Sequence, residues 1–112
     1  MKLKKIISLI PALFMFFGIA WADTIKIGFN VPLTGFAAAD GESALNGAKL
    51  AVNQANASGG INGKQIELVV YDDQASPKEA VPIANRLIEK DGVKVAVSGS
   101  YSGSTRAAAG GF

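Results

Sequence analysis

Cysteine and histidine are both absent from the 112 residues of this chain. Without cysteine, the chain cannot form a disulfide bond, a thiolate metal site or a lipid-anchored cysteine. Without histidine, a serine–histidine pair for nucleophilic catalysis cannot form within the chain. No G-x-G-x-x-G pattern follows the first predicted strand, so nothing supports a dinucleotide site. We therefore expect no enzymatic activity, no cofactor and no metal.

Long apolar runs are also scarce, with one exception near the amino terminus. Three lysines lie within residues 1–5, residues 6–19 are almost entirely apolar, and Ala20-Trp21-Ala22 has small residues at its first and third positions. These are the three parts of a secretory signal peptide. The run is shorter than the roughly 20 residues of a membrane-spanning helix. We predict a cleaved signal peptide over residues 1–22, the alternative being an uncleaved amino-terminal anchor.

The basic character of the chain belongs mostly to this leader. The full chain has a formal net charge of +2, from 11 basic and 9 acidic residues, and a pI near 9.0. Removing the three leader lysines leaves eight basic against nine acidic residues, a net charge of −1. The pI is therefore no argument for a nucleic-acid partner, and we expect none. Residues 23–112 are enough for one small core, near the lower limit of stability.

The sequence after the leader alternates between strand and helix patterns. Period-two alternation or continuous apolar runs predict strands at 24–29, 65–71 and 93–97. Apolar residues three and four apart predict helices at 41–57 and from 77 to about 90, and a further helix start lies at 106–109. The second strand is continuously apolar over residues 68–71, as expected of a strand covered on both faces, and the apolar run at 93–97 indicates a buried strand.

This order predicts an α/β fold with parallel strands and right-handed crossovers. We expect a three-stranded β-α-β-α-β-α sheet of order 2-1-3, with the first strand in the middle. The carboxyl ends of the first and third strands then form a topological switch point, the usual ligand crevice of such sheets. This arrangement places residues 33–41 beside residues 98–105.

Glycine, proline and acidic residues predict the local turns. Ser58-Gly59-Gly60 ends the first helix, and 59–64 is a turn that fails the phosphate-loop pattern. Ser76-Pro77-Lys78-Glu79 has the pattern of a capping box, and Pro82 predicts a bent first turn in the helix that follows. Asp72-Asp73 is expected to serve turn geometry and the helix dipole rather than to bind a metal ion.

The loop at 98–105 combines small residues and hydroxyls where a strand passes into a helix. It is not a nucleophile elbow, because Gly99 and Gly103 bracket Tyr101 at the position that serine would take. Two interpretations stay open. Either Ser102 or Ser104 caps the free N–H groups of the helix, or these hydroxyls and amides bind the carboxylate of a ligand.

Asp40 is similarly ambiguous. It either caps a helix that begins near Gly41, or faces the switch-point crevice and meets the ammonium group of a ligand.

Seven motifs, spread over the whole chain after the leader, together resemble one protein family. They are Ile27-Gly28-Phe29, Pro32-Leu33-Thr34-Gly35, Asn46-Gly47-Ala48, Ala57-Ser58-Gly59-Gly60-Ile61-Asn62-Gly63, Tyr71-Asp72-Asp73-Gln74, Pro77-Lys78-Glu79-Ala80 and the loop 98–105. The chain resembles the N-terminal part of a branched-chain amino-acid (leucine/isoleucine/valine-type) substrate-binding protein of an ABC transporter.

The resemblance implies a type I periplasmic-binding fold in which two lobes close on a ligand. It implies that Ser102, with Tyr101 and Gly103 beside it, binds the carboxylate of an amino acid or similar small solute. Asp40 matches a first-loop position where leucine-type members often carry an aromatic residue, so an acid there favours a different amino acid or an amide-like solute.

The resemblance also implies a periplasmic location, ABC permease subunits as partners and a monomeric full-length protein. Family members are much longer, so we expect residues 23–112 to be a partial amino-terminal lobe, either a fragment or a truncated gene product. We expect such a lobe to have an exposed apolar sheet edge, exposed sheet faces and little or no ligand affinity. A ligand-sensing domain of a receptor and an exported α/β enzyme remain as alternatives.

Overall fold

A computed structural model of the chain describes residues 23–98 and 100–112. The signal peptide expected over residues 1–22 lies outside the described residues. The elements are β1 (Ile25–Val31), α1 (Ala38–Ala57), β2 (Ile66–Asp72), α2 (Pro77–Glu89), β3 (Val95–Ser98) and α3 (Ser102–Ala109). No helix in the described ranges has the length and apolar character needed to cross a membrane.

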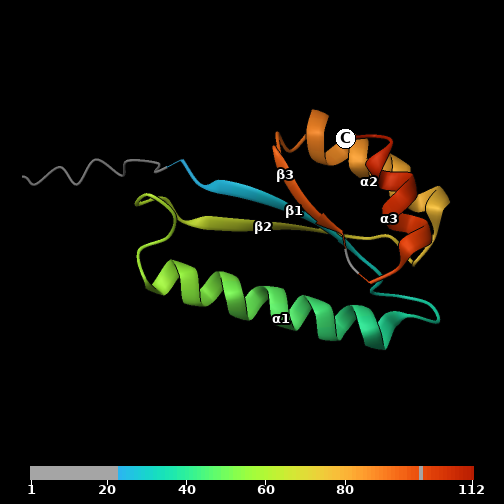
Figure 1. Cartoon of the computed structure of the whole chain (residues 1–112), viewed down its shortest axis with the longest axis horizontal. Coiled ribbons are helices and arrows are strands. Elements are labelled where there is room, and N and C mark those ends of the chain that lie inside the picture. Colours follow the sequence, from blue (N-terminus) through green and yellow to red (C-terminus); the bar gives the residue numbers. More distant parts are fainter. Residues whose placement is uncertain (1–22, 99) are drawn as a thin grey trace, which may run out of the picture.

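The three strands of the described chain form one parallel sheet in the order β2-β1-β3. Along β1, Ile25 to Val31 pair with Ile66 to Asp72 of β2, and Ile27 to Asn30 pair with Val95 to Ser98 of β3. The predicted α/β class and the sheet order 2-1-3 are therefore confirmed. The carboxyl ends of all three strands lie at one edge of the sheet, where the loops of interest begin (Figure 1).

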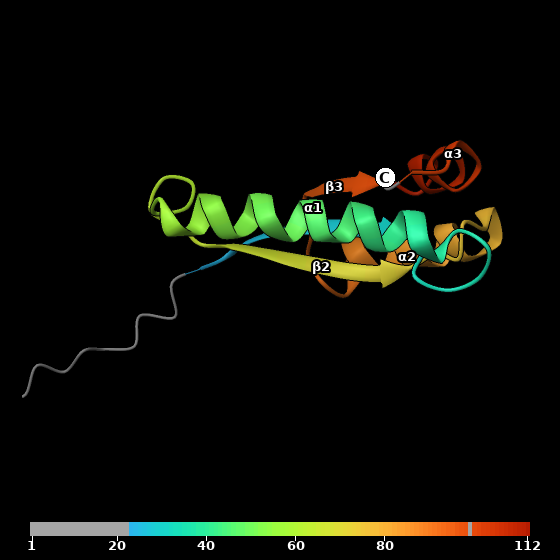
Figure 2. The same ribbon diagram turned by 90° about the horizontal axis from the view of Figure 1, so that it is seen from below.

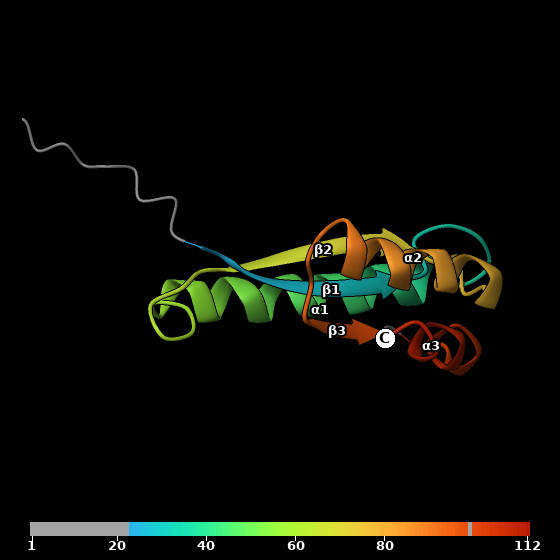
Figure 3. The same cartoon turned by 90° about the horizontal axis from the view of Figure 1, so that it is seen from above.

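Helices cover the sheet on both faces. α1 runs along one face, and α2 lies on the opposite face, as the views from below and above show (Figures 2 and 3). On the α2 side, Gly28 of β1 gives room to Leu87, because a Cβ atom at Gly28 would lie 2.9 Å from a Leu87 methyl group. The small residue therefore lets α2 approach the central strand closely.

The core on the α2 side consists of two adjoining apolar clusters. In one of them, the small side chains of Ala80, Ala84 and Ala108 pack α2 against α3. In the other, α2 packs on the sheet through Ile83, Leu87 and Val93, with Val69 and Tyr71 alongside. Pro82 lies within α2 without ending it, in agreement with the expectation of an unbroken helix.

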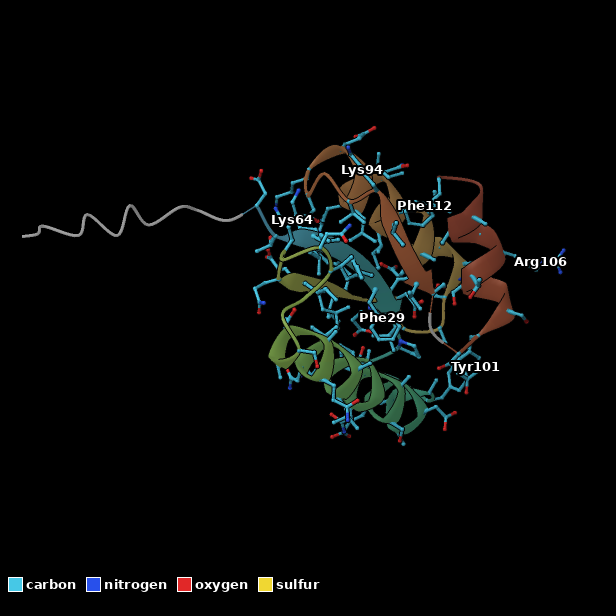
Figure 4. All side chains as sticks on the ribbon, turned by 60° about the vertical axis from the view of Figure 1, so that its left-hand side comes forward. Phe29, Lys64, Lys94, Tyr101, Arg106 and Phe112 are labelled. Atoms are coloured by element: carbon cyan, nitrogen blue, oxygen red, sulfur yellow. The ribbon has the colours of Figure 1, made fainter. Side chains whose placement is uncertain are left out.

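The α1 side is less completely packed. Phe29 points between the sheet and α1 and is buried (Figure 4), whereas the α1 stripe that faces it is half-buried and Ala51 is exposed. A cavity of about 240 Å³ on this side is lined by residues of α1 and the sheet, among them Ala51 and Val97. The interpretation of the third strand as buried is wrong, since Val95 and Val97 of β3 are 58% and 52% exposed, which agrees instead with the expected exposed apolar edge of a partial lobe. β2, which is also an edge strand, is mostly half-buried.

The expected turns form, but the expected capping box does not. Gly59 and Gly60 have φ of +99° and +75°, and a short Ile61–Lys64 bridge closes the turn that follows α1. Ser76 is the N-cap of α2, yet its side chain makes no capping bond; its carbonyl instead accepts the Glu79 and Ala80 N–H groups. Pro77 at the first helical position therefore sets this helix start without the reciprocal side-chain bonds.

Candidate functional site

The first turn of α3 presents free backbone N–H groups at the carboxyl edge of the sheet. Tyr101 is the N-cap, in an extended conformation (φ −121°, ψ 122°), and no side-chain capping bond forms. The N–H groups of Ser102, Gly103 and Ser104 have no acceptor within the helix, because the first three or four N–H groups of any helix lack one. We call these three N–H groups the α3 cradle. They make a favourable position for an anion.

The hydroxyl groups around the α3 cradle are mostly committed to holding the loop. Ser104 and Thr105 both donate to the Tyr101 carbonyl, at 3.0 and 2.9 Å, and the Thr105 hydroxyl lies 2.8 Å from that of Ser98. Ser104 is fully buried, whereas Ser102 and Gly103 are exposed. The capping interpretation of Ser102 or Ser104 is therefore wrong. The exposed Ser102 is the hydroxyl best placed to meet a ligand.

Tyr101 joins this loop to the start of α1. Its hydroxyl donates to Asp40 Oδ2 at 2.8 Å, across 61 residues of sequence. In Figure 4 the Tyr101 side chain extends from the loop before α3 toward the amino-terminal end of α1. The hydrogen bond to Asp40, together with desolvation and the Asp40 charge, raises the pKa of Tyr101. The phenol therefore remains a neutral donor throughout the physiological pH range.

Phe36 adds a second aromatic ring to the same place. Its ring meets the Tyr101 ring edge-on, with centroids 5.6 Å apart and planes at 86°. The Phe36 side chain is 81% exposed, although its ring contacts that of Tyr101. Our sequence analysis overlooked Phe36, although a bulky aromatic residue in a loop of small residues is a visible signal.

Asp40 is not the cap of α1. The helix begins at Ala38 with Ala37 as its N-cap, so Asp40 lies within the first turn and the start predicted near Gly41 is too late. A carboxylate in the first turn interacts favourably with the helix dipole, which needs no capping geometry. Asp40 is exposed and hydrogen-bonded to Tyr101 through Oδ2, which leaves Oδ1 open to solvent or to a ligand.

Gly41 determines how closely this helix start approaches the sheet. The residue is buried, and a Cβ atom placed on it would lie 1.4 Å from the Pro32 carbonyl oxygen. Only glycine allows this packing, because any side chain would displace the first turn of α1. The neighbouring Asp40 is therefore positioned by the contact between Gly41 and Pro32.

Asp72 secures the loop between β1 and α1. Its Oδ1 accepts the Leu33 N–H at 2.8 Å and the Gln74 N–H at 2.9 Å, and its Oδ2 accepts the Thr34 hydroxyl. Burial acts to raise the pKa of Asp72, but the hydrogen bonds from Thr34, Leu33 and Gln74 outweigh it and lower that pKa. The predicted role of Asp72 in turn geometry is confirmed, with the added function of holding the first loop.

Asp73 and Asn30 form a buried polar pair beneath the starts of the helices. The Asn30 amide donates to Asp73 Oδ2 at 2.8 Å, and the Ala75 N–H donates to Asp73 Oδ1 at 2.9 Å. Asp73 is fully buried and Asn30 is 1% exposed. Among the described residues, no group of three or more acidic, histidine or cysteine side chains is arranged to hold a metal ion.

Comparison with known proteins shows the family to which this sequence belongs. A family described as periplasmic binding protein matches residues 24–110. The chain belongs to the periplasmic binding protein family. A leucine-, isoleucine-, valine-, threonine- and alanine-binding protein of Pseudomonas aeruginosa is 47% identical over 87 residues, which cover 78% of this chain and 23% of that protein.

Solved structures of family members share the fold. A branched-chain amino acid transporter substrate-binding protein from Streptococcus pneumoniae, in complex with isoleucine, is 43% identical with a TM-score of 0.76, over 80% of this chain and 26% of its own. A solute-binding protein from Rhodopseudomonas palustris, in complex with 3,4-dihydroxybenzoic acid, is 33% identical with a TM-score of 0.70, over 78% and 23%. These relatives are substrate-binding proteins of transporters and not enzymes, which agrees with the expectation for this chain.

The chain spans about a quarter of the length of these relatives. The segment that it shares with them contains β1 to β3 and all four residues singled out from the sequence, Asp40, Tyr101, Ser102 and Gly103. The structure brings Asp40 and Tyr101 into direct contact and places Ser102 and Gly103 at the adjoining helix start.

Proposed function

We propose that this chain supplies one wall of the solute site of a periplasmic binding protein that serves an ABC transporter, and that the solute is a small carboxylate, in first place an aliphatic amino acid. The observation that carries the proposal is the uncapped α3 cradle beside the Tyr101–Asp40 hydrogen bond. The names of the relatives support the amino acid, because they include a leucine-, isoleucine-, valine-, threonine- and alanine-binding protein.

Each proposed role follows from charge and exposure. The carboxylate of the solute accepts hydrogen bonds from the N–H groups of Ser102 and Gly103 and from the Ser102 hydroxyl, where the positive end of the helix dipole stabilises it. The ammonium group lies near the open Oδ1 of Asp40. Tyr101 positions Asp40 and contributes its ring to the wall. The site thus meets both charges of a zwitterion with groups of opposite sign.

An aromatic carboxylate is the second candidate, and the exposed Phe36 ring favours it. Phe36 and Tyr101 form an edge-on aromatic pair that has room for a further ring on its exposed side. A relative of known structure was solved with 3,4-dihydroxybenzoic acid. Such a ligand keeps the carboxylate contact with the α3 cradle but needs no acid at Asp40.

A chimera tests the proposal where the relatives supply the rest of the fold. Residues 24–110 of this chain replace the matching segment of the Pseudomonas relative, and calorimetry measures leucine, alanine and benzoate binding. We expect leucine or alanine to bind, and Ser102→Ala to weaken binding by about 10- to 100-fold, the loss of one hydrogen bond to a charged group. Ser58→Ala, at the far end of α1, is the matched control and leaves affinity unchanged.

The Asp40→Asn chimera separates the two solute classes. Loss of the negative charge weakens amino-acid binding but leaves benzoate binding unchanged or stronger, since benzoate has no ammonium group. A folded chimera that binds none of the three carboxylates refutes the proposed function. Permease docking is checked separately, by asking whether cells that export the chimera as their only binding protein take up the bound amino acid.

A further inference from the structure

The chain contains two asparagine–glycine pairs, which lie in contrasting backbone environments. Asn46-Gly47 lies in the middle of α1, and Asn62-Gly63 forms the turn between α1 and β2. All four residues are exposed. An asparagine followed by glycine is chemically labile, because the next backbone nitrogen attacks the side-chain amide and glycine has no Cβ atom to hinder the attack. Since dipeptide and exposure are the same, the backbone determines which pair reacts.

Asn62 and Gly63 are the two central residues of a tight hairpin turn. Ile61 and Lys64 exchange two backbone hydrogen bonds, each of 2.9 Å. Asn62 and Gly63 have φ of +51° and +77°, as in a type I′ turn, which an asparagine–glycine pair favours. The structure gives the Gly63 N–H no acceptor among the described residues, so this nitrogen is open to solvent and to base.

Short-range contacts hold this turn in place. The Gly60 N–H donates to the Ala55 carbonyl at 2.8 Å, and a Cβ atom at Gly60 would collide with the Lys64 carbonyl oxygen. The Asn56 side chain bonds both backbone groups of Ile66, at 2.9 and 2.7 Å. All of these partners are near neighbours in the sequence, so the geometry of the turn is set within this one connection.

Helical hydrogen bonding protects the other pair. An α-helix engages each interior N–H with the carbonyl four residues before it, and Gly47 is far from both ends of α1. Its nitrogen therefore reacts only when the middle of the helix opens. Opening a helix interior costs more free energy than opening an exposed turn that is closed by two hydrogen bonds.

The reaction at Asn62 is an intramolecular substitution. Hydroxide removes the proton of the Gly63 N–H, and the nitrogen attacks Cγ of Asn62 when the turn opens enough to bring the two atoms together. A C–N bond forms, the bond from Cγ to the amide nitrogen breaks, and ammonia leaves with a proton taken from water. The resulting five-membered succinimide ring takes up water at either carbonyl, which gives aspartate or isoaspartate. Water is the only co-reactant.

Cationic side chains lie near the place where negative charge develops. Lys64 directly follows the pair, and together with Lys26 and Lys94 it lines a hollow of about 300 Å³ that borders the turn. No acidic side chain is among the described residues that line this hollow. Figure 4 shows Lys64 and Lys94 at the same end of the molecule. Positive charge here stabilises the deprotonated nitrogen, the tetrahedral intermediate and the carboxylate of the product.

We propose that Asn62 is a site of spontaneous deamidation in the folded chain and that Asn46 is not. The aspartate product keeps the turn, because aspartate–glycine favours the same type I′ conformation. The isoaspartate product adds a methylene group to the backbone of the turn and so breaks the two bonds between Ile61 and Lys64. Figure 1 shows this turn at the end of the sheet opposite to the start of α3, so the modification is independent of the proposed solute site.

Incubation of the folded full chain at mildly alkaline pH tests the proposal. Proteolysis and mass spectrometry then follow the amide-to-acid change in the peptides that contain Asn46 and Asn62. We expect Asn62 to react at least about tenfold faster, because its turn opens more easily than the middle of α1. In urea, which removes both structures, the two rates should be similar. The proposal is refuted by a folded chain in which Asn46 reacts as fast as Asn62, or in which neither reacts although both react in urea.

Variants at residue 62 test the site and its consequence separately. Asn62→Gly keeps the positive φ of the turn and should abolish the acid product at this position. Asn62→Asp reproduces the aspartate product and should unfold at the same urea concentration as the unmodified chain. The isoaspartate form, separated by chromatography after incubation, should unfold at a lower urea concentration. An isoaspartate form as stable as the unmodified chain would contradict the proposed loss of the turn.

Discussion

The Tyr101 hydroxyl donates a 2.8 Å hydrogen bond to Oδ2 of Asp40, and this bond ties the helix start after β3 to the helix start after β1. The two residues lie on separate βα connections that meet at the carboxyl edge of the sheet. Because Tyr101 is also the N-cap of α3, the contact fixes the position of the α3 cradle relative to α1.

Asp40→Asn should lower the pKa of Tyr101 toward its ordinary value, since the hydrogen bond to the carboxylate is the largest cause of the increase. A pH titration of the tyrosine ring signals by NMR measures this. Tyr71 is the internal control, because its raised pKa depends first on Asp91. An unchanged Tyr101 titration in the variant would contradict the contact.

The same shift has a consequence for stability. A tyrosine whose pKa is higher in the folded state holds its proton more tightly there, so its stabilising contribution is complete below the ordinary tyrosine pKa of about 10 and is lost as pH rises through the folded value. In Asp40→Asn, the part of the alkaline loss that is due to the hydrogen bond and charge of Asp40 disappears, while the part due to desolvation of Tyr101 remains. Urea unfolding from neutral to alkaline pH measures the difference.

Asp72→Ala should destabilise the chain by about 1.5–3 kcal/mol at neutral pH, because the first loop loses its charged hydrogen-bond acceptor. The lowered pKa of Asp72 gives a stability that is fully present above the ordinary carboxyl pKa and is lost as pH falls through the folded value. The variant should therefore show a weaker acid dependence in urea unfolding. Glu42→Gln, at an exposed position on α1, should retain the acid dependence of the unmodified chain.

Gly41→Ala and Gly47→Ala form a matched pair on one helix. A Cβ atom at Gly41 meets the Pro32 carbonyl oxygen at 1.4 Å, whereas at Gly47 nothing lies within 4 Å. We expect Gly41→Ala to lower the free energy of unfolding by about 3 kcal/mol, and Gly47→Ala to raise it by about 0.5–1 kcal/mol through helix propensity. Equal effects in urea unfolding would show that the close approach of α1 to Pro32 is not what glycine at 41 provides.

Asn30→Ala should destabilise the chain by about 1–3 kcal/mol, since it leaves the buried Asp73 without its side-chain donor. Asn30→Asp should behave differently with pH. It places a second carboxyl group against Asp73, and the shared site raises one carboxyl pKa. That variant should gain stability as pH falls from neutral, which urea unfolding at pH 5 and pH 7 tests. Asn46→Ala, on the exposed face of α1, is the control for both.

The sequence predicts the sheet well because its signals are local. Each strand is an alternating or continuous apolar segment bounded by glycine or polar turns, and the helical patterns between the strands favour parallel pairing. Local sequence signals also predict the turn at Gly59 and Gly60 and the end of the strand at Asp72. These features need no information about distant residues.

The helix starts were harder to predict because packing outweighs capping preference. Alanine is a poor N-cap residue, but Ala37 is only 1% exposed, and its burial determines where α1 begins. This shifts the start of α1 and moves Asp40 from the expected cap position into the first turn. At Ser76, the fixed backbone of Pro77 sets the helix start and the serine side chain is not needed.

Exposure was predicted in two conflicting ways: the apolar run at 93–97 indicated a buried strand, whereas the partial lobe indicated an exposed apolar edge, and the structure agrees with the second. An apolar run predicts the strand at 95–98 but not how far its side chains are buried. Burial depends on which other elements pack against the strand, and the local pattern does not contain that information. Val95 and Val97 therefore appear in the sequence as core residues and in the structure as an open face. The Tyr101–Asp40 contact has the same character: the switch point predicts that the two loops are close, but no local pattern names the two side chains.

The order of the elements along the chain also determines the order in which the parts of this site become available during synthesis. A chain that emerges from its amino terminus delivers the first loop early, then Asp72, 38 residues beyond Thr34, and only later Tyr101, 61 residues beyond Asp40. Asp72, which holds the loop, is therefore available before the aromatic partner Tyr101. Carboxyl-terminally shortened chains that stop after α2 should already protect the Leu33 amide from hydrogen exchange, while the start of α1 becomes protected only once residue 101 is present.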